Sequence, residues 1–111
     1  MAPNKTIVRY VLAALKPGVD REEYERYERE VDYVVAGKLK SIVSYRTHRL
    51  TEMVGEFGDG PWDYIERIEV TDRAAYEAEI ATLGKGLIDE LYEKYLDKSK
   101  TKSIWTVLVD P

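Results

Sequence analysis

The stretch TIVRYVLAAL, residues 6–15, decides the fold because apolar side chains occupy both of its alternating sets of positions. β-Branched and apolar residues at this density predict a strand, and the Lys16-Pro17-Gly18 sequence that follows is a turn signal. The last apolar stretch, SIWTVLVD at residues 103–110, shows the same double pattern. We therefore expect both strands to be buried on the two faces of a sheet.

Helix and strand signals alternate between these two stretches. A helix is predicted over residues 21–36, where Asp20 and Glu23 form a capping pair at its start. Its core stripe is expected to contain Tyr24, Tyr27, Val31 and Val34. The remaining predicted elements are strands at residues 42–51 and 62–70 and a helical region capped by Thr71 or Asp72 and divided near Gly84 and Gly86.

The order strand, helix, strand, strand, helix, strand predicts an α+β fold of the ferredoxin-like βαββαβ type, in a single domain over residues 1–111. Helices should cover one face of its four-stranded antiparallel sheet. A monomer would leave the apolar residues of the first and last strands exposed on the other face. A homodimer that packs sheet against sheet, as in a dimeric α+β barrel, would bury them.

The composition excludes several kinds of site. The chain has no cysteine, which rules out disulfides, thiolate nucleophiles and thiolate-bound metals, and its single histidine rules out a multi-histidine site within one chain. We expect neither a metal nor a cofactor. The formal net charge of −4 argues against a nucleic acid partner. The apolar run near the N-terminus is short and contains Arg9, so we expect no signal peptide or membrane span and a cytoplasmic location.

The stretch SIVSYRTHRL, residues 41–50, contains the only histidine of the chain, His48. Its strand should pair antiparallel with the next strand, so charge pairing can be used to choose the register. One register sets Arg46 opposite Arg67, which places two like charges together. A shift of one residue gives the preferred pairs: Leu50 with Trp62, Arg49 with Asp63, His48 with Tyr64, Arg46 with Glu66, and Ile42 with Val70.

The preferred register predicts a polar cluster on the apolar sheet face that should lie under the helices. His48 is the predicted general acid or base, because an imidazole titrates near neutral pH. Tyr64 would orient it or bind a developing oxyanion, and Arg46, held by Glu66, would supply a fixed positive charge. The substrate-binding candidates are Tyr10, Tyr33, Ser44, Trp62 and, in the loop GEFGDG, Phe57. The alternative interpretation is a set of ordinary cross-strand ion pairs with a hydrogen-bonded histidine.

Two further patterns are interpreted as structural. The charged run DREEYERYERE, residues 20–30, is typical of a solvated helix face with ion pairs one turn apart. The tyrosines expected to pack in the core are Tyr24, Tyr27, Tyr76 and Tyr95.

The segments VDYVVAGKLKSIVSYRTHRL, residues 31–50, and PWDYIERIEVTD, residues 61–72, resemble the RedY-like proteins, a family that includes HapK. The similarity covers residues 6–72, and the second helix and last strand agree in outline. It implies a cofactor-independent tailoring enzyme that acts on a small aromatic, nitrogen-containing metabolite in pathways to prodigiosin-type pyrroles and bisindoles, as a cyclase or by redirecting an imine. It also implies the site residues Tyr33, Arg46, His48, Tyr64 and Glu66.

Three functions stay open at this point. The first is an enzyme that works by acid–base chemistry, and the second is a binding module that presents such a compound to a partner enzyme. The third is a quinol-type monooxygenase, in which an electron-rich substrate reacts directly with oxygen. All three require an apolar cavity with a few polar groups. We take the acid–base enzyme as the working hypothesis.

Overall fold

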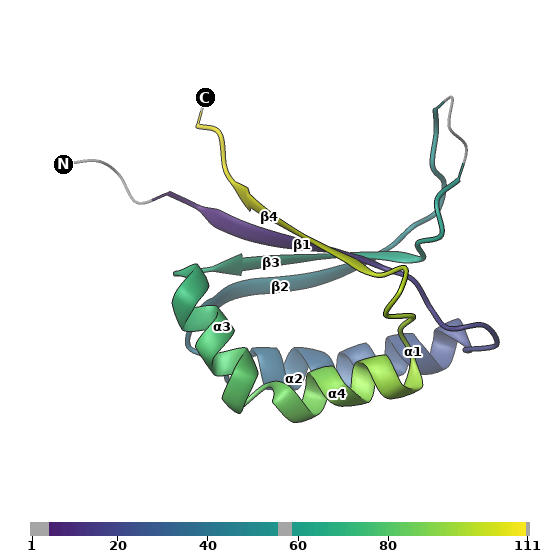
Figure 1. Cartoon of the computed structure of the whole chain (residues 1–111), viewed down its shortest axis with the longest axis horizontal. Helices are drawn as coiled ribbons and strands as arrows, with labels where there is room; N and C mark the ends of the chain where they lie inside the picture. The colour runs from purple at the N-terminus through teal and green to yellow at the C-terminus, as the bar shows by residue number, and fades with distance from the viewer. Residues whose placement is uncertain (1–4, 56–58, 111) are drawn as a thin grey trace.

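The structure is a computed structural model that describes residues 5–55 and 59–110. Its elements are β1 (Ile7–Ala13), α1 (Arg21–Tyr27), the π-helix η1 (Glu28–Asp32), α2 (Tyr33–Ala36), β2 (Ile42–Arg49), β3 (Tyr64–Val70), α3 (Arg73–Thr82), α4 (Lys85–Lys94) and β4 (Lys102–Val107). The four-stranded antiparallel sheet has the order β2-β3-β1-β4, and the helices lie on one of its faces (Figure 1). The predicted ferredoxin-like α+β fold is confirmed.

The first helical region runs without a break over residues 21–36, as predicted, but its middle part is a π-helix. Asp20 accepts a hydrogen bond from the backbone N–H of Glu22, which satisfies a free donor at the helix start. In a π-helix the hydrogen bonds span five residues instead of four, so each turn holds more residues. The side chains that follow are therefore rotated relative to a regular α-helix. Val34, predicted in the core, is 49% exposed, whereas Asp32 is buried.

The second helical region is divided at Gly84, as predicted. A side chain at Gly84 would place its Cβ 2.9 Å from Ile80 Cδ1 and 3.2 Å from Ile80 Cα, so the close approach of these two residues favours glycine. The Asp72 carboxylate accepts a hydrogen bond from the Ala75 N–H at 2.9 Å, which confirms the predicted cap. No helix in the described part of the chain is long and apolar enough to cross a membrane.

The core between sheet and helices is rich in tyrosine. Tyr24 and Tyr64 are the largest fully buried side chains of the described residues, with ring centroids 4.9 Å apart. The Tyr95 ring packs against the rings of Tyr24 and Tyr27 at 5.8 and 4.9 Å. Each such aromatic pair contributes about 0.5–1.5 kcal/mol beyond its burial. The predicted packing role of these tyrosines and of Tyr76 agrees with their burial.

The pairing of β2 with β3 differs from the register predicted from charge. Ile42 lies opposite Val70, as predicted, but a bulge at Val43 shifts all later pairs by one residue. The observed pairs beyond the bulge are Ser44 with Glu69, Tyr45 with Ile68, Arg46 with Arg67, Thr47 with Glu66, His48 with Ile65, and Arg49 with Tyr64. The predicted register is therefore wrong for every pair except the first.

Packing explains why the like-charge pair of Arg46 and Arg67 is tolerated. Each guanidinium finds another partner: Arg46 donates to the backbone oxygen of Tyr45 at 2.7 Å, and Arg67 contacts Glu69 at 3.4 Å. The observed register buries the Tyr45 ring, and full burial of a large apolar side chain contributes about 1.5–3 kcal/mol. A cross-strand charge pair is worth only about 0.2–1 kcal/mol. Core packing therefore decides the register.

The bulge also decides which side chains face the helices. We call the sheet side away from the helices the outer face. Arg46 and His48 alternate with the inward-facing Tyr45 and Thr47, so both lie on the outer face and are exposed. The predicted cluster of His48 and Arg46 with Tyr64 and Glu66 is wrong, because these two pairs of residues lie on opposite sides of the sheet.

The predicted ion pairs of this region are also replaced by others. Arg49, expected to pair with Asp63, instead forms a two-point ion pair with Glu25 of α1, at 2.7 and 2.6 Å. Asp63 pairs with Arg21 at 2.8 Å. The first of these pairs joins α1 to the end of β2, and the second joins it to the residue just before β3, so both connect the helix layer with the sheet layer instead of two neighbouring strands.

Candidate functional site

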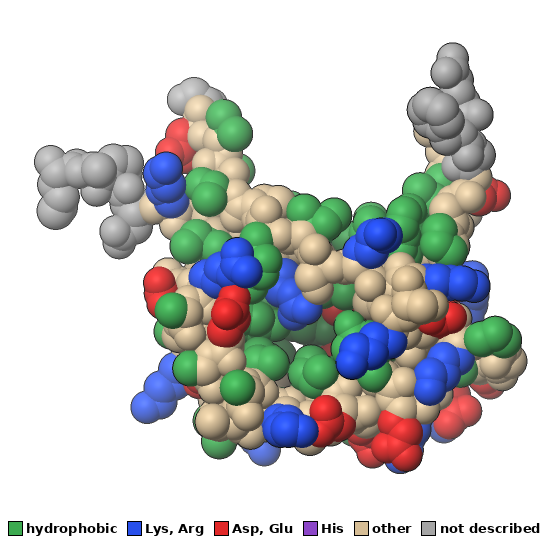
Figure 2. All heavy atoms as spheres, viewed as in Figure 1, with side chains coloured by type: hydrophobic (Ala, Val, Ile, Leu, Met, Phe, Trp, Pro, Cys, Tyr) green, Lys and Arg blue, Asp and Glu red, His purple; other side chains and the backbone are tan. Residues whose placement is uncertain are grey.

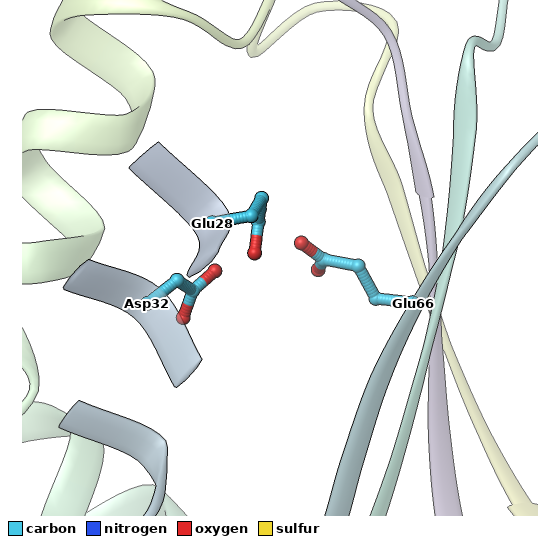
Figure 3. Close-up of side chains that lie close together, drawn as sticks. All are labelled: Glu28, Asp32 and Glu66. Atoms are coloured by element: carbon cyan, nitrogen blue, oxygen red, sulfur yellow. The ribbon is translucent and has the colours of Figure 1, made fainter. Parts of the chain in front are cut away.

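Three carboxyl groups meet in the core between the first helix and the sheet. Glu28 and Asp32 project from η1, and Glu66 projects toward them from β3 (Figure 3). Their carboxyl oxygens lie within 4.8 Å of one another, and the three residues are only 3%, 2% and 5% exposed, respectively. We call these three residues the acidic cluster. Burial of several acids together is costly, so such a cluster is a candidate functional site.

The Tyr45 hydroxyl lies among the carboxyl groups of the acidic cluster and limits which of these groups can be protonated. Its oxygen lies 2.7 Å from Asp32 Oδ2 and 2.8 Å from Glu66 Oε1. A phenol has one proton and can donate it to one of these oxygens. The other carboxyl group must then carry a proton itself and donate it to the phenol oxygen. The geometry therefore requires that Asp32 and Glu66 share at least one proton.

Electrostatics also favours the protonated form of the carboxyl groups in the acidic cluster. Burial raises the pKa of Glu28, of Asp32 and of Glu66 above the usual range, and it is the largest cause for each. The negative charge of Asp32 raises the pKa of Glu66 further, and the hydrogen bond from Tyr45 partly offsets this. The acidic cluster thus retains protons at pH values where exposed carboxyl groups are ionised. Groups of this kind can both donate and accept protons near neutral pH.

The acidic cluster separates two hollows on the helix side of the sheet. The first, which we call the apolar cavity, is bordered by Asp32, Tyr45 and Glu66 and has about 350 Å³ of empty volume, part of it open to solvent. Its other walls are Arg9, Ala36, Leu39, Ile42, Ile68, Tyr76, Ile80, Leu87, Ile88 and Leu91. Figure 2 shows an opening between the sheet and helix layers with hydrophobic side chains around it. The part of it that water molecules can occupy is about 30 Å³, which is well below the range for small-molecule sites, about 300–1,000 Å³.

The second hollow, which we call the polar pocket, also has about 350 Å³ of empty volume and is lined by Glu25, Glu28, Arg29, Tyr33, Thr47, Arg49 and Tyr64. Within it, the Thr47 hydroxyl lies 3.3 Å from Glu28 Oε2, and the Tyr33 hydroxyl accepts from the Thr47 N–H at 2.8 Å. The hydrogen bonds from Arg49 and from the Tyr64 hydroxyl lower the pKa of Glu25 to about 2. Glu25 is therefore a fixed anion, in contrast to the acidic cluster.

Three of the residues predicted from the sequence border these hollows. Glu66 belongs to the acidic cluster, and Tyr33 and Tyr64 line the polar pocket. Burial raises the pKa of the Tyr64 phenol, and its hydrogen bond to Glu25 at 2.6 Å raises it further. Tyr64 therefore stays neutral and donates a hydrogen bond.

Other predicted residues lie elsewhere. Tyr10 and Ser44, like His48 and Arg46, are on the outer face. Trp62 lies near the β2–β3 connection, where its indole N–H donates to the Lys100 carbonyl at 2.8 Å. Phe57, also predicted to bind substrate, lies outside the described residues. The structure thus does not bring these side chains to the acidic cluster.

Two members of the acidic cluster and Tyr45 were missed in the sequence. Glu28 lies within the charged run of residues 20–30 that was interpreted as a solvated helix face, and the predicted register would have turned Tyr45, next to Arg46, away from the helices. The available signal was the spacing of Tyr24, Glu28 and Asp32, which recur every four residues. This spacing places them on one side of a helix, in line with a tyrosine that was correctly assigned to the core.

The acidic cluster also has the donor atoms of a site for a hard metal ion. Each of its residues offers one carboxylate oxygen, the ligand type that Mg²⁺, Ca²⁺ and Mn²⁺ prefer. However, the Tyr45 hydroxyl already bridges two of the three carboxyl groups. In this geometry Asp32 and Glu66 are therefore arranged to share a proton through the Tyr45 hydroxyl.

Comparison with known families identifies the chain. Residues 7–109 match the family model described as REDY-like protein HapK. The chain belongs to this family. The resemblance to RedY-like proteins seen in the sequence is thereby confirmed, and the HapK family match extends it to the second helical region and the last strand. No protein with a curated description matches the sequence significantly.

Solved structures show the same fold. The crystal structure of HapK from Hahella chejuensis is 23% identical, with a TM-score of 0.71, and the match covers 96% of this chain and 94% of that one. A Dabb family protein with a ferredoxin-like fold from Mesorhizobium loti is 14% identical, with a TM-score of 0.70 and coverage of 96% and 99%. A dimeric ferredoxin-like protein from Thermobifida fusca is 9% identical, with a TM-score of 0.69 and coverage of 95% and 92%. At these identities the structural similarity establishes the fold alone.

Proposed function

We propose that the chain is a cofactor-independent tailoring enzyme that acts by acid–base chemistry on an aromatic pyrrole- or bisindole-type intermediate, as a cyclase or by redirecting an imine. The observation that carries the proposal is the Tyr45 hydroxyl between Asp32 and Glu66, at 2.7 and 2.8 Å, on the wall of the apolar cavity. Membership of the HapK family supports the substrate class, because the resemblance to RedY-like proteins implies such intermediates.

In this mechanism Glu66 is the general acid and base. It borders the apolar cavity, so a small substrate group that enters this cavity can come within hydrogen-bond distance of its carboxyl group. The protonated carboxyl group donates to a substrate nitrogen, and the carboxylate that remains takes a proton from a neighbouring carbon or nitrogen. Tyr45 and Asp32 share the negative charge while Glu66 is ionised. Asp32 and Tyr45 thus act as positioning residues for Glu66.

The proposal replaces His48 by Glu66 as the principal proton carrier. The reason is position, because His48 is exposed on the outer face while Glu66 is buried beside the apolar cavity. Tyr33 and Tyr64 keep a role as candidate substrate contacts through the polar pocket.

Turnover of candidate pyrrole and bisindole intermediates by Glu66→Gln tests this assignment. We expect a loss of at least about 10²-fold, because positioned acid–base catalysis contributes about 10²–10⁴ in rate. The matched control is Glu30→Gln, since Glu30 lies in the same π-helix as Glu28 but is exposed. Near-normal turnover by a folded Glu66→Gln protein, with loss in His48→Gln, would return the role to the histidine.

The same assay separates the other functions. Reactions under air and under argon distinguish an oxygen-dependent monooxygenase from an enzyme that works by proton transfer alone. Saturable binding of the intermediates without any turnover would instead indicate a binding module. The proposed enzyme requires turnover that is independent of oxygen.

We also propose that the protein is a homodimer joined through its outer face. Ile104, opposite Tyr10 of β1, is 44% exposed there, and Leu108, directly after the end of β4, is 53% exposed. The Thermobifida fusca protein of the same fold is dimeric, which supports the proposal. Light scattering at micromolar concentration should give a mass twice that of one chain for the wild-type protein. The Ile104→Glu variant should give the mass of a single chain. A wild-type protein that is monomeric under these conditions would contradict the proposal.

A further inference from the structure

We propose that the groove between β4 and α3 binds an aromatic carboxylate, whose carboxylate group is held by Arg9, Tyr76 and Ser103. We call this hollow the β4 groove. The space that water molecules can occupy in it is about 280 Å³, close to the lower end of the range for small-molecule sites. The inference does not rest on the proposed function, because the residues that line the β4 groove do not include the acidic cluster.

The first support is an arginine without an acidic partner. Arg9 lines the β4 groove from β1, where it lies opposite Trp105. None of the ion pairs within 4.0 Å in the described part of the chain includes Arg9. Burial raises the pKa of Glu66 and the charge of Arg9 partly offsets this, but from beyond ion-pair distance. Glu77, the acid that lines the β4 groove, is already paired with Arg73 at 2.6 Å. The positive charge of Arg9 is therefore left for a ligand.

The second support is a set of hydrogen-bond donors without acceptors. Arg9 donates from Nη1 to the Tyr76 hydroxyl at 2.7 Å and from Nη2 to Ser103 Oγ at 2.6 Å. Because both oxygens accept from Arg9, each hydroxyl must direct its own proton elsewhere. Neither hydroxyl has a second hydrogen-bond partner among the described residues. Two hydroxyl protons and the remaining N–H groups of Arg9 are thus available to one anion.

The Tyr76 hydroxyl is the most telling of these donors. The residue is only 4% exposed, so solvent offers its hydroxyl little compensation. Burial also raises the pKa of the phenol, which therefore keeps its proton. A ligand oxygen in the β4 groove would supply the acceptor that this proton lacks.

The third support is the apolar wall beside these donors. The Trp105 ring lines the β4 groove and packs edge to face against Tyr76, with ring centroids 5.7 Å apart. Ile80 and Ala81 of α3 add aliphatic surface. An inorganic anion would leave this wall without contacts, and an organic cation would be repelled by Arg9. An aromatic ring with a carboxylate matches both parts, since the planar guanidinium can bind a carboxylate at two points.

Binding of three indole compounds of similar size tests the inference directly. Titration calorimetry at pH 7 would compare indole-3-acetate, which is an anion, with neutral 3-methylindole and cationic tryptamine. We expect indole-3-acetate to bind at least about tenfold more tightly than the other two, because a charge-assisted hydrogen bond is worth about one to two powers of ten in affinity.

Variants assign the preference to the β4 groove. Arg9→Gln should remove it, whereas Arg26→Gln, which removes an exposed arginine of α1 outside the groove, should keep it. Tyr76→Phe retains the ring and removes the hydroxyl. It should weaken the binding of indole-3-acetate by about three- to tenfold and leave that of 3-methylindole unchanged.

Three results would overturn the inference. The first is equal binding of the three indole compounds to the wild-type protein, which requires no variant. The second is a preference for indole-3-acetate that persists in folded Arg9→Gln. The third is acetate that binds as tightly as indole-3-acetate, because the aromatic wall would then contribute nothing. Turnover is not measured in this experiment, so failure of the proposed catalytic role of Glu66 would leave its outcome unchanged.

Discussion

Replacement of Glu28 by glutamine should change how the stability of the protein depends on pH. In the unfolded chain a glutamate titrates near pH 4.3, whereas burial and the contact with Asp32 raise its pKa in the folded protein far above this value. Between the two pKa values the unfolded chain has released the proton and the folded protein retains it. Folding then takes up a proton, so the free energy of unfolding falls as pH rises through this window.

The magnitude follows from linkage. Each group that takes up one proton on folding lowers the free energy of unfolding by about 1.4 kcal/mol per pH unit within its window. From pH 5 to pH 7 this amounts to about 2.7 kcal/mol for Glu28 alone. Glutamine has a similar shape and does not ionise. Glu28→Gln should therefore gain stability relative to the wild type as pH rises, by up to about 1.4 kcal/mol per unit.

Urea denaturation at pH 5, 6, 7 and 8, at one fixed protein concentration, measures this difference. The control is Glu30→Gln, which removes an exposed carboxylate from the same π-helix and should run parallel to the wild type. The reasoning is refuted if the free energies of Glu28→Gln and wild type also run parallel across this range. A parallel course would mean that Glu28 is already ionised in the folded protein at pH 5.

Three further changes test other parts of the structure. Tyr45→Phe removes the hydroxyl between Asp32 and Glu66 and should cost about 1–3 kcal/mol in urea denaturation, because it leaves buried acceptors without a donor. Asp72→Ala removes the cap of α3 and should cost about 0.5–2 kcal/mol, while Asp72→Asn, which retains a capping oxygen, should cost less. Arg46→Glu, made in the Ile104→Glu variant, places an opposite charge against Arg67 and should raise the free energy of unfolding by about 0.2–1 kcal/mol. In the register predicted from charge, the new glutamate would instead face Glu66, and the free energy of unfolding would fall.

The parts of the fold that depend on nearby residues could be predicted from the sequence. The first helical region covers residues 21–36 after its Asp20 cap, as predicted, and Asp72 caps the second region as expected. The order of elements then leaves few ways to arrange a sheet with helices on one face. The fold class follows from these local signals.

The register of β2 could not be predicted in the same way. A bulge at Val43 leaves no clear mark in the sequence, and it moves Arg46 and His48 to the outer face while Tyr45 turns inward. The prediction relied on avoiding the contact between Arg46 and Arg67, but two facing arginines that each have another partner cost less than exposure of a core tyrosine.

The acidic cluster was hidden for a different reason. Glutamate and aspartate are rarely buried, so Glu28 in the charged run and Asp32 just after it predict a solvated surface. Their spacing of four residues from the buried Tyr24 was the sequence signal that these two acids face the sheet, and the π-helix that begins at Glu28 was not predicted. Glu66 was found only because strand alternation placed it with Tyr64, a relation that a one-residue shift of β2 leaves intact.

The bulge at Val43 has a consequence for how the protein avoids aggregation. In the order β2-β3-β1-β4, β2 is an edge strand, and one side of its backbone has no partner strand among the described residues. Long flat edges recruit strands from other molecules, and natural proteins interrupt them with bulges and charged side chains. β2 carries both, since the bulge at Val43 is followed by Arg46 and Arg49. This edge of the sheet is therefore protected against the formation of continuous cross-chain β-sheets.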